Sequence, residues 1–176
     1  MGKVICIDAR MWGIKHTGIG RYIENLIDNL PGEVVLIVPL DLKNEPKLAK
    51  FTKYYARFHP YSLLAQFEMF WILSFIRPDL LHVPHFTIPV LWPGKMVVTI
   101  HDLIKHISTG SDTTTRHPFL YRVKYLGYLI IVWLAVHRAC HIIVPAQYWK
   151  SILEKKYHLD PAKISVTYEG VSPAFL

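Results

Sequence analysis

Three histidines come at or just after the ends of two short apolar runs, where side chains can take part in acid–base or hydrogen-bond chemistry. His82 ends the run 80–83 and is followed by His85 and Phe86, and His101 with Asp102 follows the run 96–100. An imidazole can act as an acid, a base or a hydrogen-bond donor to a hydroxyl. Asp102 can orient a neighbouring histidine or bind a hydroxyl itself. The pattern predicts a cleft lined by these five side chains.

The same histidines raise the alternative of a metal site. His82-x-x-His85 together with His101 supplies three nitrogen ligands of the kind that zinc binds. Successive side chains of a strand point to opposite faces, so convergence of the three rings on one point is not assured. We therefore predict no metal. A simpler interpretation also stays open, in which these polar residues only cap the ends of their strands.

A second candidate site is the segment 17–22, which reads Thr-Gly-Ile-Gly-Arg-Tyr. Gly18 and Gly20 allow the backbone to approach a phosphate, and the start of the following helix offers free N–H groups and a positive dipole end. With Arg21 they form the candidate phosphate loop. Ile23 stands where a dinucleotide fingerprint would have its third glycine, so that motif is incomplete. The alternative is a flexible turn before a helix.

The elements that must position these residues follow from the hydrophobic pattern. Strands are expected at 4–7, 34–38, 51–58, 80–83, 96–100, 142–144 and 164–168, and helices at 19–30, 62–75, 121–138 and 146–157. A strand, glycine loop, helix and strand in this order form a βαβ unit with parallel strands. The chain is therefore predicted to be a single α/β domain, a doubly wound, Rossmann-like parallel sheet of about seven strands. Ligands of such sheets bind beyond the carboxyl ends of the strands.

Composition and charge narrow the function classes. The chain has 176 residues, of which 52% are hydrophobic, and a net charge of +7. This charge predicts a polyanionic partner, either a phosphorylated small molecule or an anionic membrane surface. Nucleic acid is not expected, because the chain has no run of five like charges and no nucleic-acid recognition motif. Cys6 and Cys140 are too few for a disulfide scaffold, and both are expected to be buried free thiols.

Aromatic residues recur at helical spacing in two stretches, which include Phe67, Phe70, Trp71 and Phe75 and then Tyr121, Tyr125, Tyr128 and Trp133. Most are expected in the core, with a membrane-facing or partner-facing surface as the alternative. The apolar run 126–136 is too short for a membrane span, which needs about 20 residues. No signal peptide is recognisable. We therefore expect a cytoplasmic protein, with peripheral attachment to the inner membrane face as a further option.

Several motifs occur in the order known from one enzyme family. They are the segments 7–10, 17–22, 77–86, 98–103, 139–144, 160–166 and 168–175. Together they resemble the N-terminal, acceptor-binding domain of retaining group 1 (family four) glycosyltransferases of the GT-B fold, and the resemblance covers essentially the whole chain. Pro145 and Glu169 depart from the family pattern, which has a small polar residue and an asparagine at those positions.

The resemblance implies roles for the residues named above. His101 would face the transferred sugar, and Asp102 would hold the acceptor or the histidine. Gly18, Gly20 and Arg21 would approach the diphosphate of a nucleotide-sugar, and His82, His85 and Phe86 would line the acceptor cleft. The acceptor would be a lipid-linked molecule or a polysaccharide. The family needs neither a metal nor another cofactor.

The resemblance also implies a domain organisation. Residues 1–168 would form the acceptor-side domain and 169–176 the start of an interdomain linker, with the donor-binding C-terminal domain absent from this sequence. The chain alone would then transfer sugar weakly or not at all. Two alternatives remain open, a catalytically incomplete relative that binds a membrane or a partner, and a homodimer in which one subunit supplies the wall that the other lacks.

Overall fold

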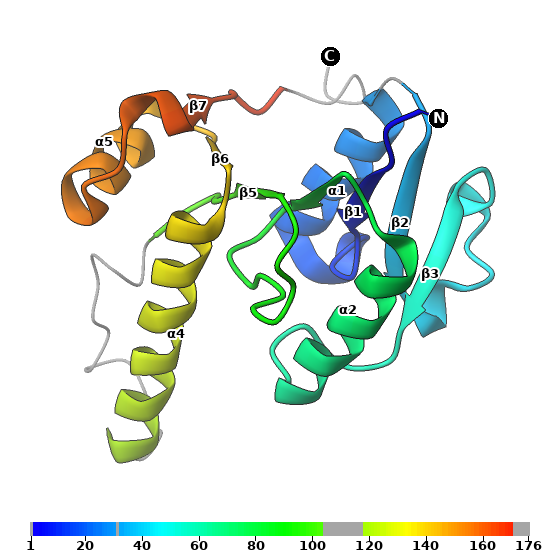
Figure 1. The fold of residues 1–176 in the computed structure, drawn as a ribbon, viewed down its shortest axis with the longest axis horizontal. Coiled ribbons are helices and arrows are strands. Elements are labelled where there is room, and N and C mark those ends of the chain that lie inside the picture. Colours follow the sequence, from blue (N-terminus) through cyan, green and yellow to red (C-terminus); the bar gives the residue numbers. More distant parts are fainter. Residues whose placement is uncertain (1, 31, 104–117, 171–176) are drawn as a thin grey trace.

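The computed structural model describes residues 2–30, 32–103 and 118–170, and in them the predicted doubly wound α/β fold is confirmed (Figure 1). Seven strands form one fully parallel sheet in the order β3-β2-β1-β4-β5-β6-β7. The strands are β1 Ile5–Asp8, β2 Val34–Pro39, β3 Thr52–Ala56, β4 Leu80–Val83, β5 Met96–Thr99, β6 His141–Val144 and β7 Ile164–Val166. The α-helices are α1 Thr17–Asn29, α2 Leu63–Ile76, α4 Pro118–Arg138 and α5 Gln147–Tyr157.

The short connections are also regular in places. Single turns of 3-10 helix occupy Ile14–His16, Leu40–Leu42, Pro46–Leu48 and Pro161–Lys163. Residues 104–117, the side chain of Tyr121 and the linker residues 171–176 lie outside the described part of the chain.

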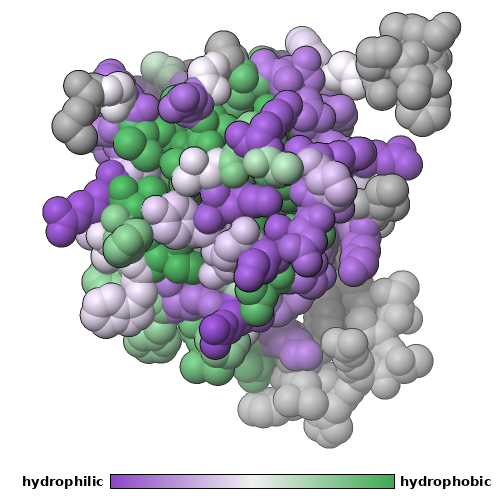
Figure 2. All heavy atoms as spheres, turned by 90° about the vertical axis from the view of Figure 1, so that its right-hand side faces the viewer, coloured by the Kyte–Doolittle hydropathy of each residue, from purple (hydrophilic) through white to green (hydrophobic). Residues whose placement is uncertain are grey.

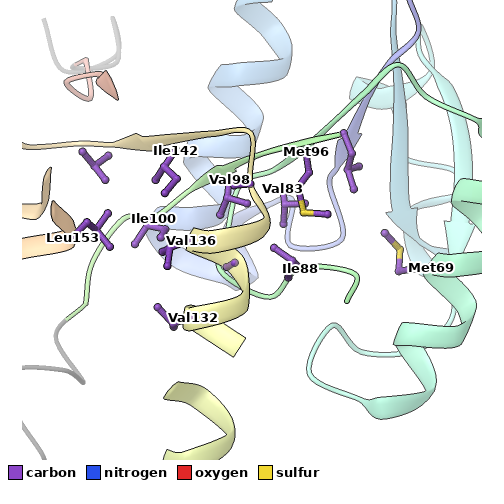
Figure 3. Packing of buried hydrophobic residues seen from close by; sticks show 14 of the residues in the cluster. Met69, Val83, Ile88, Met96, Val98, Ile100, Val132, Val136, Ile142 and Leu153 are labelled. Carbon is purple, nitrogen blue, oxygen red and sulfur yellow. The ribbon is translucent and has the colours of Figure 1, made fainter. Parts of the chain in front are cut away.

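The sheet has a hydrophobic cluster on each face, because alternate strand residues point to opposite sides. Cys6 belongs to the cluster that includes Met69 of α2, Val132 of α4 and Leu153 of α5 (Figure 3). The neighbouring residues of β1 and β2 pack instead against α1 on the other face. The strands are buried on both faces, which explains why their sequences are continuous apolar runs.

The motif 77–79 has a structural role. Arg77 ends α2 in the left-handed conformation, with its backbone N–H donating to the Leu73 carbonyl. The carboxylate of Asp79 accepts a hydrogen bond of 2.7 Å from the backbone N–H of Val4. This bond ties the start of β4 to the start of β1, so the two strands end at the same edge of the sheet.

The expectation that the aromatic residues lie mostly in the core is wrong for α2. Phe67, Trp71 and Phe75 are 60%, 70% and 77% exposed, whereas Met69 and Leu73 are fully buried. The helix is apolar on all sides, so its sequence carries no periodic signal for the side that faces the sheet. Hydrophobic residues also reach the surface among hydrophilic ones on the side of the molecule shown in Figure 2.

The α4 helix is much longer than the strands that it covers. Its 21 residues extend about 31 Å, whereas a four-residue strand extends about 13 Å. Val132 and Val136 are buried against the sheet, while Leu126 and Ile130 are exposed. In Figure 1 the first turns of α4 extend well beyond the sheet. No helix in the described ranges is long and apolar enough to cross a bilayer.

Of the two cysteines, only Cys6 is a buried thiol as expected. Cys140 is exposed, which corrects the expectation from its apolar neighbourhood. It lies in the turn between α4 and β6, and its thiol donates to the Met96 carbonyl.

Candidate functional site at the carboxyl edge of the sheet

His101 lies just beyond the end of β5 and is held by two hydrogen-bond acceptors. Its Nδ1 is 3.0 Å from a carboxylate oxygen of Glu169, and its Nε2 is 3.2 Å from the backbone carbonyl oxygen of Pro84. A carboxylate and a carbonyl can only accept, so both contacts form fully when the ring donates from both nitrogens. The ring is thus oriented by segments that follow β4, β5 and β7.

A buried chain of hydroxyl groups lies behind His101. The ring of Tyr22 meets the His101 ring edge-on, with centroids 4.6 Å apart. The Tyr22 hydroxyl is 3.2 Å from the Thr99 hydroxyl, which in turn is 2.8 Å from Nε2 of His82. The first turns of α1 are therefore linked directly to the ends of β4 and β5.

His82 was predicted to line the acceptor cleft, but the structure places it in the interior. Its side chain is bonded to Thr99, and only 8% of the residue is exposed. Burial, with a smaller effect of the nearby His101, lowers the pKa of His82 to about 4. His82 is therefore neutral near pH 7 and supports the site from behind.

His85 and Phe86 lie together after β4. The backbone N–H of Thr87 donates to Nδ1 of His85, so this nitrogen carries no proton. The proton of the neutral ring is then on Nε2, which is 3.3 Å from the hydroxyl of Tyr61. The Phe86 ring stacks near His85 at 3.9 Å and meets Tyr128 of α4 edge-on at 5.2 Å. These two predicted residues do share one edge with His101.

Asp102 is exposed and lies next to His101 in the sequence. Burial raises the pKa of the Tyr128 phenol, and the charges of Tyr157 and Asp102 raise it further.

The negative charge of Asp8, at the end of β1, is balanced by a partner within the protein. Its carboxylate forms a buried, two-pronged ion pair with Arg10, with N–O distances of 2.8 and 2.7 Å. A cavity of about 10 Å³, large enough for about one water molecule, is lined by Asp8, Pro84 and His85. The ends of β1 and β4 thus come together at this edge.

Packing requires a glycine at only one of the two glycine positions of the candidate phosphate loop. A Cβ on Gly20 would lie 1.9 Å from the carbonyl oxygen of Gly13, so packing alone excludes a side chain there. A Cβ on Gly18 would meet nothing within 4 Å. Thr17, the first residue of α1, has a φ of 53°, a strained conformation for a β-branched residue. Arg21 is exposed on the next turn.

The beginning of α1 is electropositive. Its N-cap residue His16 makes no side-chain hydrogen bond to the helix, and no acidic residue lies in the first turn. The preceding turn supplies Lys15. Burial lowers the pKa of His16, as do the nearby His59 and Lys15. The backbone N–H groups of a helix start are suited to an anion, and Lys15, the cation beside them, also pairs with Asp41 at 3.8 Å.

In the described ranges, no group of three or more His, Cys, Asp or Glu residues is arranged to hold a metal ion.

Sequence reasoning missed four residues of this edge, namely Tyr22, Tyr61, Thr99 and Glu169. Thr99 had a usable signal, because it lies two residues before His101 in an extended segment, where alternate side chains share a face. Glu169 was noted only as a departure from the family pattern. Its contact with His101 joins residues 68 apart in sequence, which no local pattern predicts.

Comparisons with known proteins agree with the motifs. The family model described as Glycosyltransferase Family 4 matches residues 16–175. A solved glycosyltransferase from Rickettsia africae ESF-5 matches with 14% identity and a TM-score of 0.48. The match covers 96% of this chain and 43% of the Rickettsia chain. A solved "putative epimerase" from Burkholderia cenocepacia J2315 matches with 15% identity and a TM-score of 0.44. The match covers 81% of this chain and 52% of the Burkholderia chain.

This chain thus spans about half the length of each of these two proteins. No curated protein sequence matches it. Because the family model covers nearly the whole chain, the protein belongs to glycosyltransferase family 4.

Proposed function

We propose that this chain is the acceptor-side half of a retaining GT-B glycosyltransferase, which moves a sugar from a nucleotide-sugar to a lipid-linked or polysaccharide acceptor. One observation carries the proposal. Tyr22, just after the glycine loop, contacts His101, so the candidate phosphate loop and the candidate catalytic histidine belong to one site. Residues 169–176 would begin the linker to the donor-binding domain.

His101 would face the transferred sugar, with its ring oriented by Glu169 and the Pro84 carbonyl. Asp102 and Phe86 would contact the acceptor, and the buried His85, whose ring centroid is 3.9 Å from that of Phe86, would position Phe86. In the transfer, the bond between the anomeric carbon and the diphosphate breaks, and a bond to the acceptor oxygen forms on the same face. The proton of the acceptor hydroxyl leaves with the nucleoside diphosphate. No metal or other cofactor is proposed.

The phosphate loop can be tested without knowing the donor, with inorganic pyrophosphate as the probe. We expect pyrophosphate to shift the backbone amide resonances of Gly18 and Gly20, but not that of Gly94, which precedes β5 at the opposite edge. Arg21→Ala should weaken the binding several-fold, whereas Lys155→Ala, at an exposed position on α5, should not. Equal shifts at Gly94, or equal losses in both variants, would contradict the assignment.

Transfer is measured with radiolabelled UDP- and GDP-sugars, with and without a separately expressed donor-binding domain. The chain alone should show little transfer, and the activity that appears with the second domain should be lost in His101→Ala. Efficient transfer by the chain alone would contradict the half-enzyme proposal. It would favour a homodimer, which light scattering would detect.

The second candidate function is a module that attaches to an anionic membrane from the cytoplasm without catalysis. The exposed apolar residues Leu63, Phe67, Trp71 and Phe75 of α2 favour it. Such a surface, on a chain of net charge +7, can insert aromatic side chains between anionic headgroups. Co-sedimentation with anionic vesicles at low and high salt tests it, and no binding at low salt would exclude this function.

A further inference from the structure

A groove of about 880 Å³ lies between α2 and α4 and reaches the candidate site at Phe86 and Thr87. Both helices connect parallel strands, so they run opposite to the strands and begin at the carboxyl edge. Leu63 and Phe67 of α2 form one wall, and Tyr128 and Ile131 of α4 form the other. In Figure 1 the first turns of α4, at one end of this groove, extend beyond the sheet.

The polar groups of the groove are already hydrogen-bonded within the protein. The side-chain amide of Gln66 donates to the Ile88 carbonyl and accepts from the Val90 N–H. The Thr87 and Tyr61 hydroxyls both bond to His85. A glycan chain would need many hydrogen-bonding partners, whereas a hydrocarbon chain needs none. The lining therefore favours a hydrocarbon occupant.

Charge in the groove is confined to one cation. Lys124 is the single charged residue among the lining residues, and no carboxylate is among them. It lies one helical turn before Tyr128, which contacts Phe86, so it stands at the outer end of the groove. Leu134 lies at the opposite, inner end. This arrangement is suited to a molecule with an apolar tail and an anionic head.

We infer that this groove binds the hydrocarbon chain of a lipid-linked acceptor, whose phosphate lies at Lys124. The inference rests on the proposed function and decides between its two acceptor classes. Tyr128 of the groove contacts Phe86, which shares an edge with His101, so the sugar-accepting end of the lipid would emerge toward Asp102 and His101. A second copy of this chain is disfavoured as the occupant, because it would bring further positive charge to Lys124 and Arg122.

Calorimetric titration with hexyl and decyl phosphate, below the concentrations at which they form micelles, tests the groove directly. Each buried methylene strengthens binding by up to about fourfold, so decyl phosphate should bind at least tenfold more tightly than hexyl phosphate. Lys124→Ala should weaken the binding of decyl phosphate but leave that of decanol unchanged. Equal affinities for the two chain lengths would overturn the inference.

Gly127 offers a matched pair of variants on α4. It lines the groove, and a Cβ there would meet nothing within 4 Å, so a side chain can be added without disturbing the core. Gly127→Trp should fill the groove and reduce decyl phosphate binding at least tenfold, whereas Gly127→Ala should retain it. Gly127→Leu provides a smaller blocking side chain, and thermal unfolding checks that each variant folds. Unchanged binding in the folded blocking variants would overturn the inference.

Two further measurements distinguish this inference from its alternatives. Binding to anionic vesicles without binding of the monomeric probe would mean that the groove faces a bilayer surface, which overturns the inference. Pyrophosphate binding at Gly18 reports on the proposed function alone and should be the same in Gly127→Trp and the wild type. If pyrophosphate binds but decyl phosphate does not, the inference about the groove fails. If decyl phosphate binds but pyrophosphate does not, the proposed function fails.

Discussion

Gly20 and Gly18 lie two residues apart at the start of α1, and alanine at each should change stability in opposite directions. A Cβ on Gly20 would lie 1.9 Å from the Gly13 carbonyl oxygen and 3.1 Å from that of Met11. A Cβ on Gly18 would meet no atom within 4 Å. The two substitutions add the same methyl group to the same helix and differ in what it touches.

The magnitude at Gly20 follows from how little the loop can move. The Gly13 carbonyl would have to shift by about 1.5 Å, from 1.9 Å to an ordinary contact of 3.4 Å. It also accepts the His16 N–H at 3.1 Å, and this hydrogen bond would be strained or lost. Overpacking costs about 1–3 kcal/mol and the hydrogen bond about 1 kcal/mol, while alanine regains about 1 kcal/mol of helix propensity. The net loss is about 2 kcal/mol.

Gly18→Ala should instead raise the free energy of unfolding by up to about 1 kcal/mol, because it only gains helix propensity. The two variants then differ by about 3 kcal/mol, or about 6–12 °C in melting temperature for a chain of this size. Thermal unfolding followed by circular dichroism measures this difference. Equal melting temperatures would refute the packing argument, and a less stable Gly18→Ala would show that the surface at Gly18 is not open.

Three further substitutions test the interior of the site and the helix faces. Thr99→Val removes the hydrogen-bond partner of the buried His82 and should lower the free energy of unfolding in urea by about 1–3 kcal/mol. Thr52→Val, at an exposed position, should lower it little. Equal losses in the two variants would contradict the buried hydrogen bond. The pKa of His82 falls from 6.5 to about 4 on folding, so its contribution to stability is complete above pH 6.5 and is lost as the pH falls toward 4. His82→Gln should remove that part of the pH dependence, about 3 kcal/mol over this range, and an unchanged profile would argue against it. Leu73→Ala should destabilise by about 2–5 kcal/mol, whereas the exposed Trp71→Ala on the same helix should change stability by less than about 1 kcal/mol, and a large loss at Trp71 would place it in the core.

The fold was predictable because its signals are local. The βαβ start follows from two apolar runs flanking a glycine loop, and Ser62 caps α2 as its residue type predicts, accepting the Leu64 N–H. The strand 51–58 was also recognised, although the structure shortens it to Thr52–Ala56. Each of these features depends on a few consecutive residues, so the chain around them carries enough information.

The faces of the uniformly apolar helices were not predictable. In α2, Met69 and Trp71 are both apolar, so the sequence does not show which of them faces the core. Met69 is buried because of the way the helix crosses the sheet. Cys140 illustrates the same limit, because it is exposed in the turn between α4 and β6 although its neighbours in the sequence are apolar. Position relative to the sheet is a property of the packed molecule.

For the site, the sequence by itself determined which residue types stand at the carboxyl edge. His85, His101 and Asp102 follow strands, and parallel strands end together. Only the tertiary structure decided their surroundings: His82 is buried and bonded to Thr99, and His101 is bonded to Glu169, 68 residues away. The physical reason is that the positions of the strands along the chain follow from local patterns, whereas hydrogen-bond partners and burial depend on distances between segments that meet only after folding.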